Sequence, residues 1–290
     1  MTRRAPTRAA IYGVTVLAAL ATGAGAPRTA SAEPPSRVVS LNLCADELLL
    51  RLARPEQIAS VTFLSRDPKQ STVADLARDH PVNYGRAEDV LRFDPDLVVA
   101  GRYTTRTTVD FLRRNGETLL ELDAPATLPQ VEEQIRRLGE ALGEPDRAQA
   151  LADEIAAAFA EGDPIDDVAR PTAVVFAPNG FTVGAGSLVD TIINAAGLRN
   201  LGAEQDLGSY RHLPLERLLA LAPDVLILAA TESAPARAYE VLHHPILSRL
   251  PSQPVIVRLS PRLWTCAGPE IARALSILRG AAAEARERET

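Results

Sequence analysis

The sequence predicts an α/β protein with two Rossmann-like lobes, each holding a parallel-rich sheet, joined by a single long helical linker, with a ligand cleft between the lobes. The first observation is a repeat, because segment 88–100 aligns with segment 216–228 and Glu, Leu, Pro and Asp recur 128 residues apart. Second, each copy ends in a short apolar run without polar alternation, which is typical of a strand buried on both faces of a parallel sheet. Third, a long helical stretch separates the copies. Parallel strands need helical crossovers, and clefts between lobes favour small ligands.

The elements follow in order along the chain. Residues 33–127 form the expected first lobe, with strands at 37–41, 58–61, 97–100 and 118–122 and helices at 45–53 and 105–114. Residues 128–163 form the linker, because apolar residues recur there at helical spacing, with Pro145 marking a kink or a break. Residues 164–290 form the second lobe, with strands at 172–176, 225–229 and 255–257 and helices at 188–196 and from 269 onward.

The N-terminus has the pattern of a cleaved secretory signal over residues 1–32. Arg3, Arg4 and Arg8 precede an apolar stretch without acids, and small residues end it at Ala30–Ala32. A membrane anchor is the alternative, but Thr and Gly interrupt the apolar run. Cleavage near Ala32 removes four Arg and no acid, so the formal charge changes from −6 to −10. A strongly acidic mature chain argues against nucleic acid as a partner.

Several segments together resemble one family. They are Arg37–Asn42 at the first strand, both repeated Glu segments, and 186–190 followed by 196–200. With these features the chain resembles periplasmic substrate-binding proteins of the helical-backbone class, which serve cobalamin, iron-siderophore and haem uptake by ABC transporters. The resemblance implies a monomer in the periplasm that captures a metal chelate, with a siderophore or cobalamin ahead of haem, and delivers it to an ABC permease dimer with its ATPase. It implies small hinge motion, no catalytic residue, no cofactor and no resident metal.

Glu88 and Glu216 open the two repeated segments. In the family that the chain resembles, the acid at this point of each lobe docks onto arginines of the paired permease subunits. Two carboxylates, one per lobe, would supply charge-assisted hydrogen bonds to a two-fold partner. The alternative is that each Glu only stabilises a helix N-terminus through the macrodipole. Recurrence at equivalent points of both lobes favours docking.

Most candidate ligand-binding residues follow the predicted strands, because open α/β sheets bind ligands beyond the carboxyl ends of their strands. Arg86, Tyr210 and Arg211 are candidates because they lie just before the repeated Glu segments. Aromatic side chains would stack on a chelate, and Arg side chains would meet its carboxylates or phosphate. The alternatives are ordinary packing for the aromatic residues and solubility for the arginines. The candidates are Asn42, Cys44, Arg86, Tyr103, Phe181, Tyr210, Arg211, Trp264 and Cys266.

The two cysteines, Cys44 and Cys266, allow three interpretations. A disulfide suits an oxidising compartment, although a bond across the cleft would pin the lobes together. Buried, inert thiols come second, because free Cys is among the most buried residue types. Metal or haem-iron ligation by thiolate comes third, because two cysteines without clustered His fall short of a zinc set.

Other function classes have weaker support in the sequence. The Gly-x-Gly at 184–186 lacks both a following Gly-Lys-Ser/Thr and a full dinucleotide fingerprint. No sequence motif indicates a nucleophile with a placed His and acid. A receptor for a free transition-metal ion would need several converging His, and the chain has four. A haem receptor, a free-metal receptor and an exported enzyme on the same fold remain the alternatives.

Overall fold

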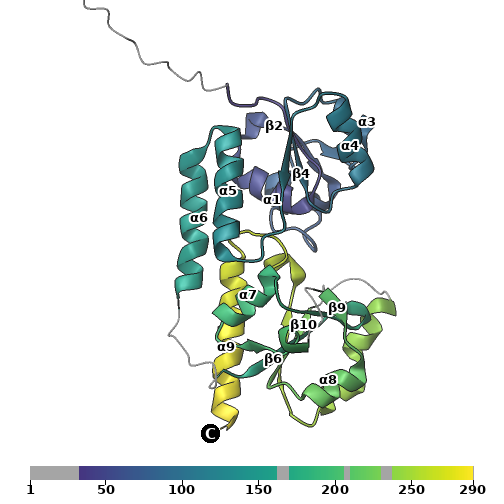
Figure 1. The fold of residues 1–290 in the computed structure, drawn as a ribbon, viewed down its shortest axis with the longest axis vertical. Helices are drawn as coiled ribbons and strands as arrows, with labels where there is room; N and C mark the ends of the chain where they lie inside the picture. Colours follow the sequence, from purple (N-terminus) through teal and green to yellow (C-terminus); the bar gives the residue numbers. More distant parts are fainter. Residues whose placement is uncertain (1–32, 162–169, 206–209, 230–236, 290) are drawn as a thin grey trace, which may run out of the picture. The chain divides into compact units, whose positions relative to one another are not determined.

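The computed structural model describes residues 33–161, 170–205, 210–229 and 237–289, and Pro34–Thr290 form one compact unit (Figure 1). The predicted signal peptide, residues 1–32, lies outside the described residues. Within the described ranges, no helix is long and apolar enough to cross a membrane.

The first lobe contains a five-stranded parallel sheet in the order β3-β2-β1-β4-β5. Its strands are β1 (Val38–Ser40), β2 (Ile58–Thr62), β3 (Val82–Asn83), β4 (Leu97–Gly101) and β5 (Leu119–Leu122). Its helices are α1 (Leu43–Leu52), α2 (Ala74–Ala77), α3 (Ala87–Leu91) and α4 (Arg106–Arg114), with 3₁₀ helices η1 (Pro55–Gln57) and η2 (Phe63–Arg66). The order reverses between β1 and β4, so the loops after these two strands diverge and leave a crevice for a ligand.

The second lobe repeats this arrangement with a four-stranded parallel sheet in the order β11-β10-β6-β8. Its strands are β6 (Thr172–Phe176), β8 (Arg199–Asn200), β10 (Val225–Ala229) and β11 (Val255–Leu259), and β7 (Phe181–Val183) pairs antiparallel with β9 (Tyr210–His212). Its helices are α7 (Leu188–Ala195), α8 (Leu215–Leu221) and α9 (Ile271–Glu289), with 3₁₀ helices η4 (Pro178–Gly180), η5 (Ala203–Gln205), η6 (Arg237–His243), η7 (Pro245–Arg249) and η8 (Pro261–Leu263). The predicted fold class is confirmed: two α/β lobes with parallel-rich sheets.

The Pro-Asp pair of the repeat has the same structural role in both lobes. The Asp96 carboxylate accepts from the backbone N–H groups of Ser36 at 2.7 Å and Arg37 at 2.9 Å, just before β1. The Asp224 carboxylate accepts from Thr172 N–H at 2.8 Å, at the start of β6. Each Asp therefore ties the beginning of one central strand to the beginning of its neighbour, which sets the register of both sheets.

The linker differs from the expected single long helix. It consists of α5 (Leu128–Leu142) and α6 (Pro145–Ala160), which lie side by side (Figure 1). Gly143 ends α5 in the left-handed region at φ 75°, which only glycine adopts without strain, and Pro145 starts α6 where its missing N–H is not needed. A β-carbon on Gly139 would lie 2.2 Å from the Ala148 Cβ, so a glycine lets the two helices pack closely.

One hydrophobic cluster reaches across both lobes and the linker. In the first lobe, Leu48, Leu49 and Leu52 of α1 are fully buried together with Ile135 and Leu138 of α5. In the second lobe, the same cluster includes the inner face of α9, and α9 also contacts α6. The linker therefore packs against α1 of the first lobe and α9 of the second lobe.

Candidate ligand cleft

A cleft of about 450 Å³ lies between the two lobes, at the carboxyl ends of both parallel sheets. The first lobe lines it with the segments after β1, β4 and β5, and the second lobe with the segments after β6 and β11, the last residue of β10 and the start of α7. This is the position at which open α/β sheets bind ligands, and the volume falls in the usual range for small-molecule sites.

Seven of the nine predicted ligand-binding residues line this cleft: Asn42, Cys44, Tyr103, Phe181, Tyr210, Trp264 and Cys266. The structure does not bring Arg86 and Arg211 to it. Arg86 sits at the start of α3, two residues before Glu88. Arg211 follows Tyr210 in β9, and successive side chains of a strand point to opposite sides, so it faces away when Tyr210 faces the cleft.

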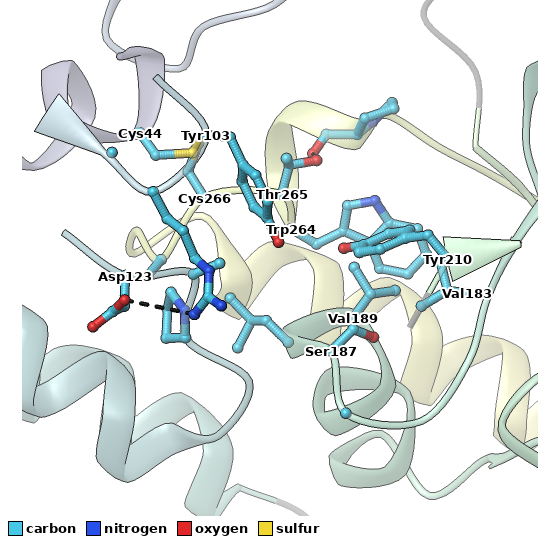
Figure 2. A pocket seen from close by; sticks show the side chains of 18 of the residues that line it. Cys44, Tyr103, Asp123, Val183, Ser187, Val189, Tyr210, Trp264, Thr265 and Cys266 are labelled. Atoms are coloured by element: carbon cyan, nitrogen blue, oxygen red, sulfur yellow. Dashed lines mark hydrogen bonds and ion pairs between the residues drawn. A yellow bond between two sulfur atoms is a disulfide. The ribbon is translucent and has the colours of Figure 1, made fainter. Parts of the chain in front are cut away.

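Tyr103 and Tyr210 present phenol rings to the cleft from opposite lobes. They are 81 % and 61 % exposed, and Figure 2 shows their hydroxyl groups pointing toward each other. The surrounding protein raises the pKa of the Tyr210 phenol, and the nearby Tyr103 adds to the shift. The Tyr210 phenol therefore stays protonated at neutral pH, and both rings offer hydroxyl groups and apolar surfaces to a ligand.

Trp264 differs from these two tyrosines because it is only 2 % exposed and belongs to the main hydrophobic cluster. Its ring forms part of the cleft wall but is mostly covered by packing. Phe181, at 48 % exposed, offers more free ring surface on the same side. The packing alternative therefore describes Trp264 at least as well as stacking does, and its ligand role stays a prediction.

Asn42 has a structural task at the cleft. Its side-chain Oδ1 accepts from the N–H groups of Cys44 at 2.9 Å and Ala45 at 3.2 Å, so it caps the N-terminus of α1. A β-carbon on Gly101 would lie 2.8 Å from the Asn42 Cγ, so the loop after β4 approaches this cap closely. With Oδ1 occupied, the Nδ2 group is what remains to offer a ligand.

Charge in the cleft comes from Arg102 and Asp123; the other described residues that line it are uncharged. Arg102 Nη1 lies 3.7 Å from Asp123 Oδ1, an ion pair drawn in Figure 2. The sequence interpretation missed Asp123. It follows the strand predicted at 118–122, so inspecting the end of that strand as well would have found it.

Two buried polar side chains line the cleft without a partner in the described part of the chain. They are Gln134 of α5, through Oε1, and Thr182 of β7, through Oγ1. Leaving such groups unpaired costs about 1–3 kcal/mol each unless a ligand or water meets them. Gln134 was also missed, because it lies in the middle of a helix whose pattern shows nothing about a neighbouring cleft.

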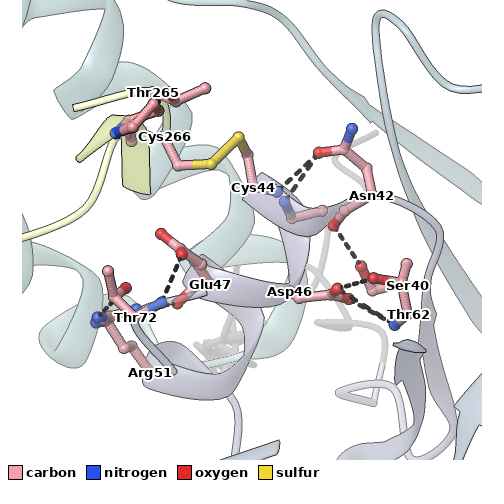
Figure 3. The surroundings of a disulfide bond; sticks show 12 residues. Ser40, Asn42, Cys44, Asp46, Glu47, Arg51, Thr62, Thr72, Thr265 and Cys266 are labelled. Carbon is pink, nitrogen blue, oxygen red and sulfur yellow. Dashed lines mark hydrogen bonds between the residues drawn. A yellow bond between two sulfur atoms is a disulfide. The ribbon is translucent and has the colours of Figure 1, made fainter. Parts of the chain in front are cut away.

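Cys44 and Cys266 form a disulfide, as the first of the three interpretations predicts (Figure 3). Cys44 stands at the start of α1 in the first lobe, and Cys266 lies between η8 and α9 in the second. Both line the cleft, so the bond joins the lobes covalently there. Because the bond uses both sulfurs, thiolate ligation of a metal is set aside.

Polar contacts reinforce this junction of the lobes. Arg51 of α1 forms an ion pair with Glu270, whose side chain is 23 % exposed. Arg262 donates to the Pro68 carbonyl at 2.6 Å, again from the second lobe to the first. Disulfide, ion pair and hydrogen bond together hold the two lobes in one arrangement.

Within the described ranges, no three His, Cys, Asp or Glu side chains lie close enough together to hold a metal ion.

Asp46 is fully buried behind the cleft, one turn into α1. Its carboxyl accepts from Thr62 N–H at 3.1 Å and from the Thr62 hydroxyl (Figure 3). Burial nevertheless outweighs these hydrogen bonds and raises its pKa from 3.8 to about 7. The adjacent Glu47 also has a raised pKa because of burial. The first lobe therefore contains carboxyls that resist ionisation.

We predict that the free energy of unfolding falls as pH rises from about 4 to about 8. A carboxyl whose pKa is higher in the folded protein stabilises the fold fully below its unfolded pKa and loses that contribution as pH rises through about 7. Asp46→Asn keeps the shape without the charge, so it should flatten this fall by on the order of 2 kcal/mol. Urea unfolding at several pH values measures the effect, with exposed Asp79→Asn as the control. An unchanged slope in Asp46→Asn contradicts the prediction.

Glu88 and Glu216 occupy equivalent places in the two lobes. Glu88 lies in the first turn of α3 and Glu216 in the first turn of α8, and both are exposed. Within the described residues, neither carboxylate has a hydrogen bond or an ion pair. Both the docking and the helix-dipole interpretations are compatible with this geometry, since a first-turn acid is free to do both.

Comparison with known proteins identifies the family. A family model described as "Periplasmic binding protein" matches residues 38–252, which is most of the chain. The chain belongs to this family. Its members are binding proteins, which agrees with a cleft built from loops of two lobes. The matched residues include every strand of both sheets except the last, β11, and they end before the closing helix α9.

Individual relatives of this periplasmic binding protein differ in their described ligands. A "Cobalamin-binding protein" of Halobacterium salinarum is 31 % identical over 201 residues, 67 % of this chain and 53 % of the relative, so the match spans about half of that protein's length. The apo structure of the periplasmic heme-binding protein RhuT from Roseiflexus sp. RS-1 is 26 % identical, with a TM-score of 0.69 over 87 % of this chain and 99 % of that one. The vitamin B12 binding protein BtuF of Vibrio cholerae is 17 % identical with a TM-score of 0.65 over 88 % and 99 %, which shows the shared fold.

Proposed function

We propose that this protein is the periplasmic receptor of an ABC importer, which captures a metal chelate in its interlobe cleft and delivers it to an inner-membrane permease. The observation that carries the proposal is the cleft itself. It is formed by the strand ends of both lobes, and each lobe contributes an exposed phenol. Flat aromatic and apolar surfaces facing one another suit a ligand with a broad, rigid body.

The ligand classes under consideration are a corrinoid, a ferric siderophore and haem. The relative from Halobacterium salinarum is described as cobalamin-binding and RhuT as heme-binding, so the relatives support both tetrapyrrole classes. Function then consists of capture and docking without a chemical reaction. Because the disulfide and the contacts beside it join the lobes, affinity depends on a preformed cleft more than on closure.

The test is a titration of the mature protein with cyanocobalamin, haemin, ferrichrome and ferric enterobactin, followed by the fluorescence of Trp264, which is the sole tryptophan of the chain. We expect saturable binding of one chelate with micromolar or tighter affinity. Tyr103→Ala and Tyr210→Ala should each weaken it about tenfold, since each removes a large contact surface. Exposed Phe111→Ala on α4, which does not line the cleft, is the control. Failure of all four chelates to bind would contradict the proposed function.

A further inference from the structure

The charges of the cleft narrow the ligand class further. Arg102 follows β4 and Asp123 follows β5, and these strands are neighbours in the sheet of the first lobe. Their side chains are 61 % and 74 % exposed, so solvent and ligand reach both. Because the remaining described lining residues are uncharged, the two charges cancel and the described cleft wall carries no net charge.

We propose that Asp123 makes this cleft selective for uncharged, amide-bearing chelates by cancelling the positive charge of Arg102. This inference rests on the proposed function, since it assumes that a chelate enters the cleft. Because Asp123 already pairs with Arg102, an anionic ligand would find the arginine neutralised and would be repelled by the Asp123 carboxylate, which disfavours its binding. Haem with two propionates and a ferric catecholate with three negative charges are both disfavoured in this way.

An unpartnered polar atom of a residue that lines the cleft points to the same ligand class. Gln134 Oε1 is an acceptor without a donor in the described part of the chain, and its side chain is 6 % exposed. A carboxylate ligand brings only acceptors, which leave an amide oxygen unsatisfied. Primary and secondary amides bring N–H donors, which suit the acceptor Gln134 Oε1.

Two sources share this chemistry: a corrinoid, whose ring is edged with carboxamides, and an uncharged ferric hydroxamate built on a peptide backbone. The shared properties are zero net charge on the ligand periphery and amide donors. The test therefore pairs a neutral and an anionic ligand for each source. The pairs are cyanocobalamin with its monocarboxylic acid derivative, and ferrichrome with ferric enterobactin.

The measured quantity is the ratio of dissociation constants within each pair, for the wild-type chain, Asp123→Asn and a matched control. We expect the wild type to prefer the neutral member by about tenfold, and Asp123→Asn to lose that preference or reverse it, because Arg102 is then unopposed. The matched control is Asp75→Asn, which removes an arginine-paired aspartate of the same lobe away from the cleft. It should leave the ratio at the wild-type value. Added salt should reduce the wild-type preference.

The outcomes separate the two proposals. A ratio that shifts in Asp123→Asn and not in Asp75→Asn supports charge selection, and the pair that binds identifies the source. A ratio that is the same in all three chains overturns charge selection and leaves the receptor function standing. Haemin or enterobactin binding tighter than either neutral chelate also overturns it. If none of these ligands binds to any of the three chains, the proposed function fails and this inference fails with it.

Discussion

Replacing both Glu88 and Glu216 by alanine should reduce ligand import at least about 100-fold while leaving ligand affinity unchanged. The two carboxylates are exposed, lie in the first turns of α3 and α8, and have no partner among the described residues. Truncating a charged side chain that pairs with an arginine at an interface weakens the binding free energy by about 2–5 kcal/mol. Two such pairs would also orient the receptor on a two-fold permease. The helix-dipole contribution that is lost at the same time is only about 0.3–1 kcal/mol per site.

Import into cells that lack the endogenous receptor, together with a binding titration of each purified variant, measures these two quantities. The control is Asp79→Ala with Glu154→Ala, which also removes two exposed acids, one from the first lobe and one from the linker. Each single Glu variant should lose part of the import. Normal import by the double variant would mean that the two acids act only as helix-start residues.

Removing the Cys44–Cys266 disulfide should both destabilise the protein and weaken ligand binding. The bond closes a loop of 222 residues in sequence and joins α1 to the second lobe at the cleft. Loss of a natural disulfide of this loop length lowers the free energy of unfolding by about 2–5 kcal/mol. Without the covalent bond, the lobes must be ordered by the ligand, so affinity should fall about tenfold through lost preorganisation.

Cys44→Ser with Cys266→Ser, compared with the wild type in urea unfolding and in ligand titration, tests both effects. Reducing the disulfide of the wild type with dithiothreitol removes the same bond without a substitution, so it gives a result even if the double variant folds poorly. Dithiothreitol on the double variant should then change neither quantity, which controls for effects of the reductant. Equal affinity with and without the bond would show that the Arg51–Glu270 ion pair and the packing alone set the cleft.

The fold was largely predictable because its signals are local. Apolar runs without alternation indicated buried parallel strands, and Val225–Ala229 was predicted with the bounds that the structure has. The repeated Pro-Asp pair marked equivalent places in both lobes, where Asp96 and Asp224 tie neighbouring strands together. The linker was predicted less well. A Pro in a helical pattern permits either a kink or a break, and Gly143 in a left-handed conformation decided for a break.

The site was predictable only in outline. The rule that ligands bind beyond strand ends led to Tyr103 and Phe181, which do line the cleft. Arg86 and Arg211 were expected at the cleft because they lie just before the repeated Glu segments. They do not line it, because the direction of a side chain depends on its place in a helix or a strand. Gln134 was not predictable, since a polar residue within an amphipathic helix normally faces water.

The sequence by itself determined two related α/β lobes, a helical connection between them, and two acids at equivalent positions. Each of these features depends on a pattern within a short, contiguous segment of the chain. Only the tertiary structure decided that the linker is a pair of helices, that Cys44 meets Cys266, and that Asp123 cancels Arg102 in the cleft. Distances between side chains of separate elements follow from the packing of the whole core, in which every buried group must be accommodated at once. The charge and hydrogen-bonding needs of the cleft, on which ligand choice depends, therefore emerge only after the lobes are in place.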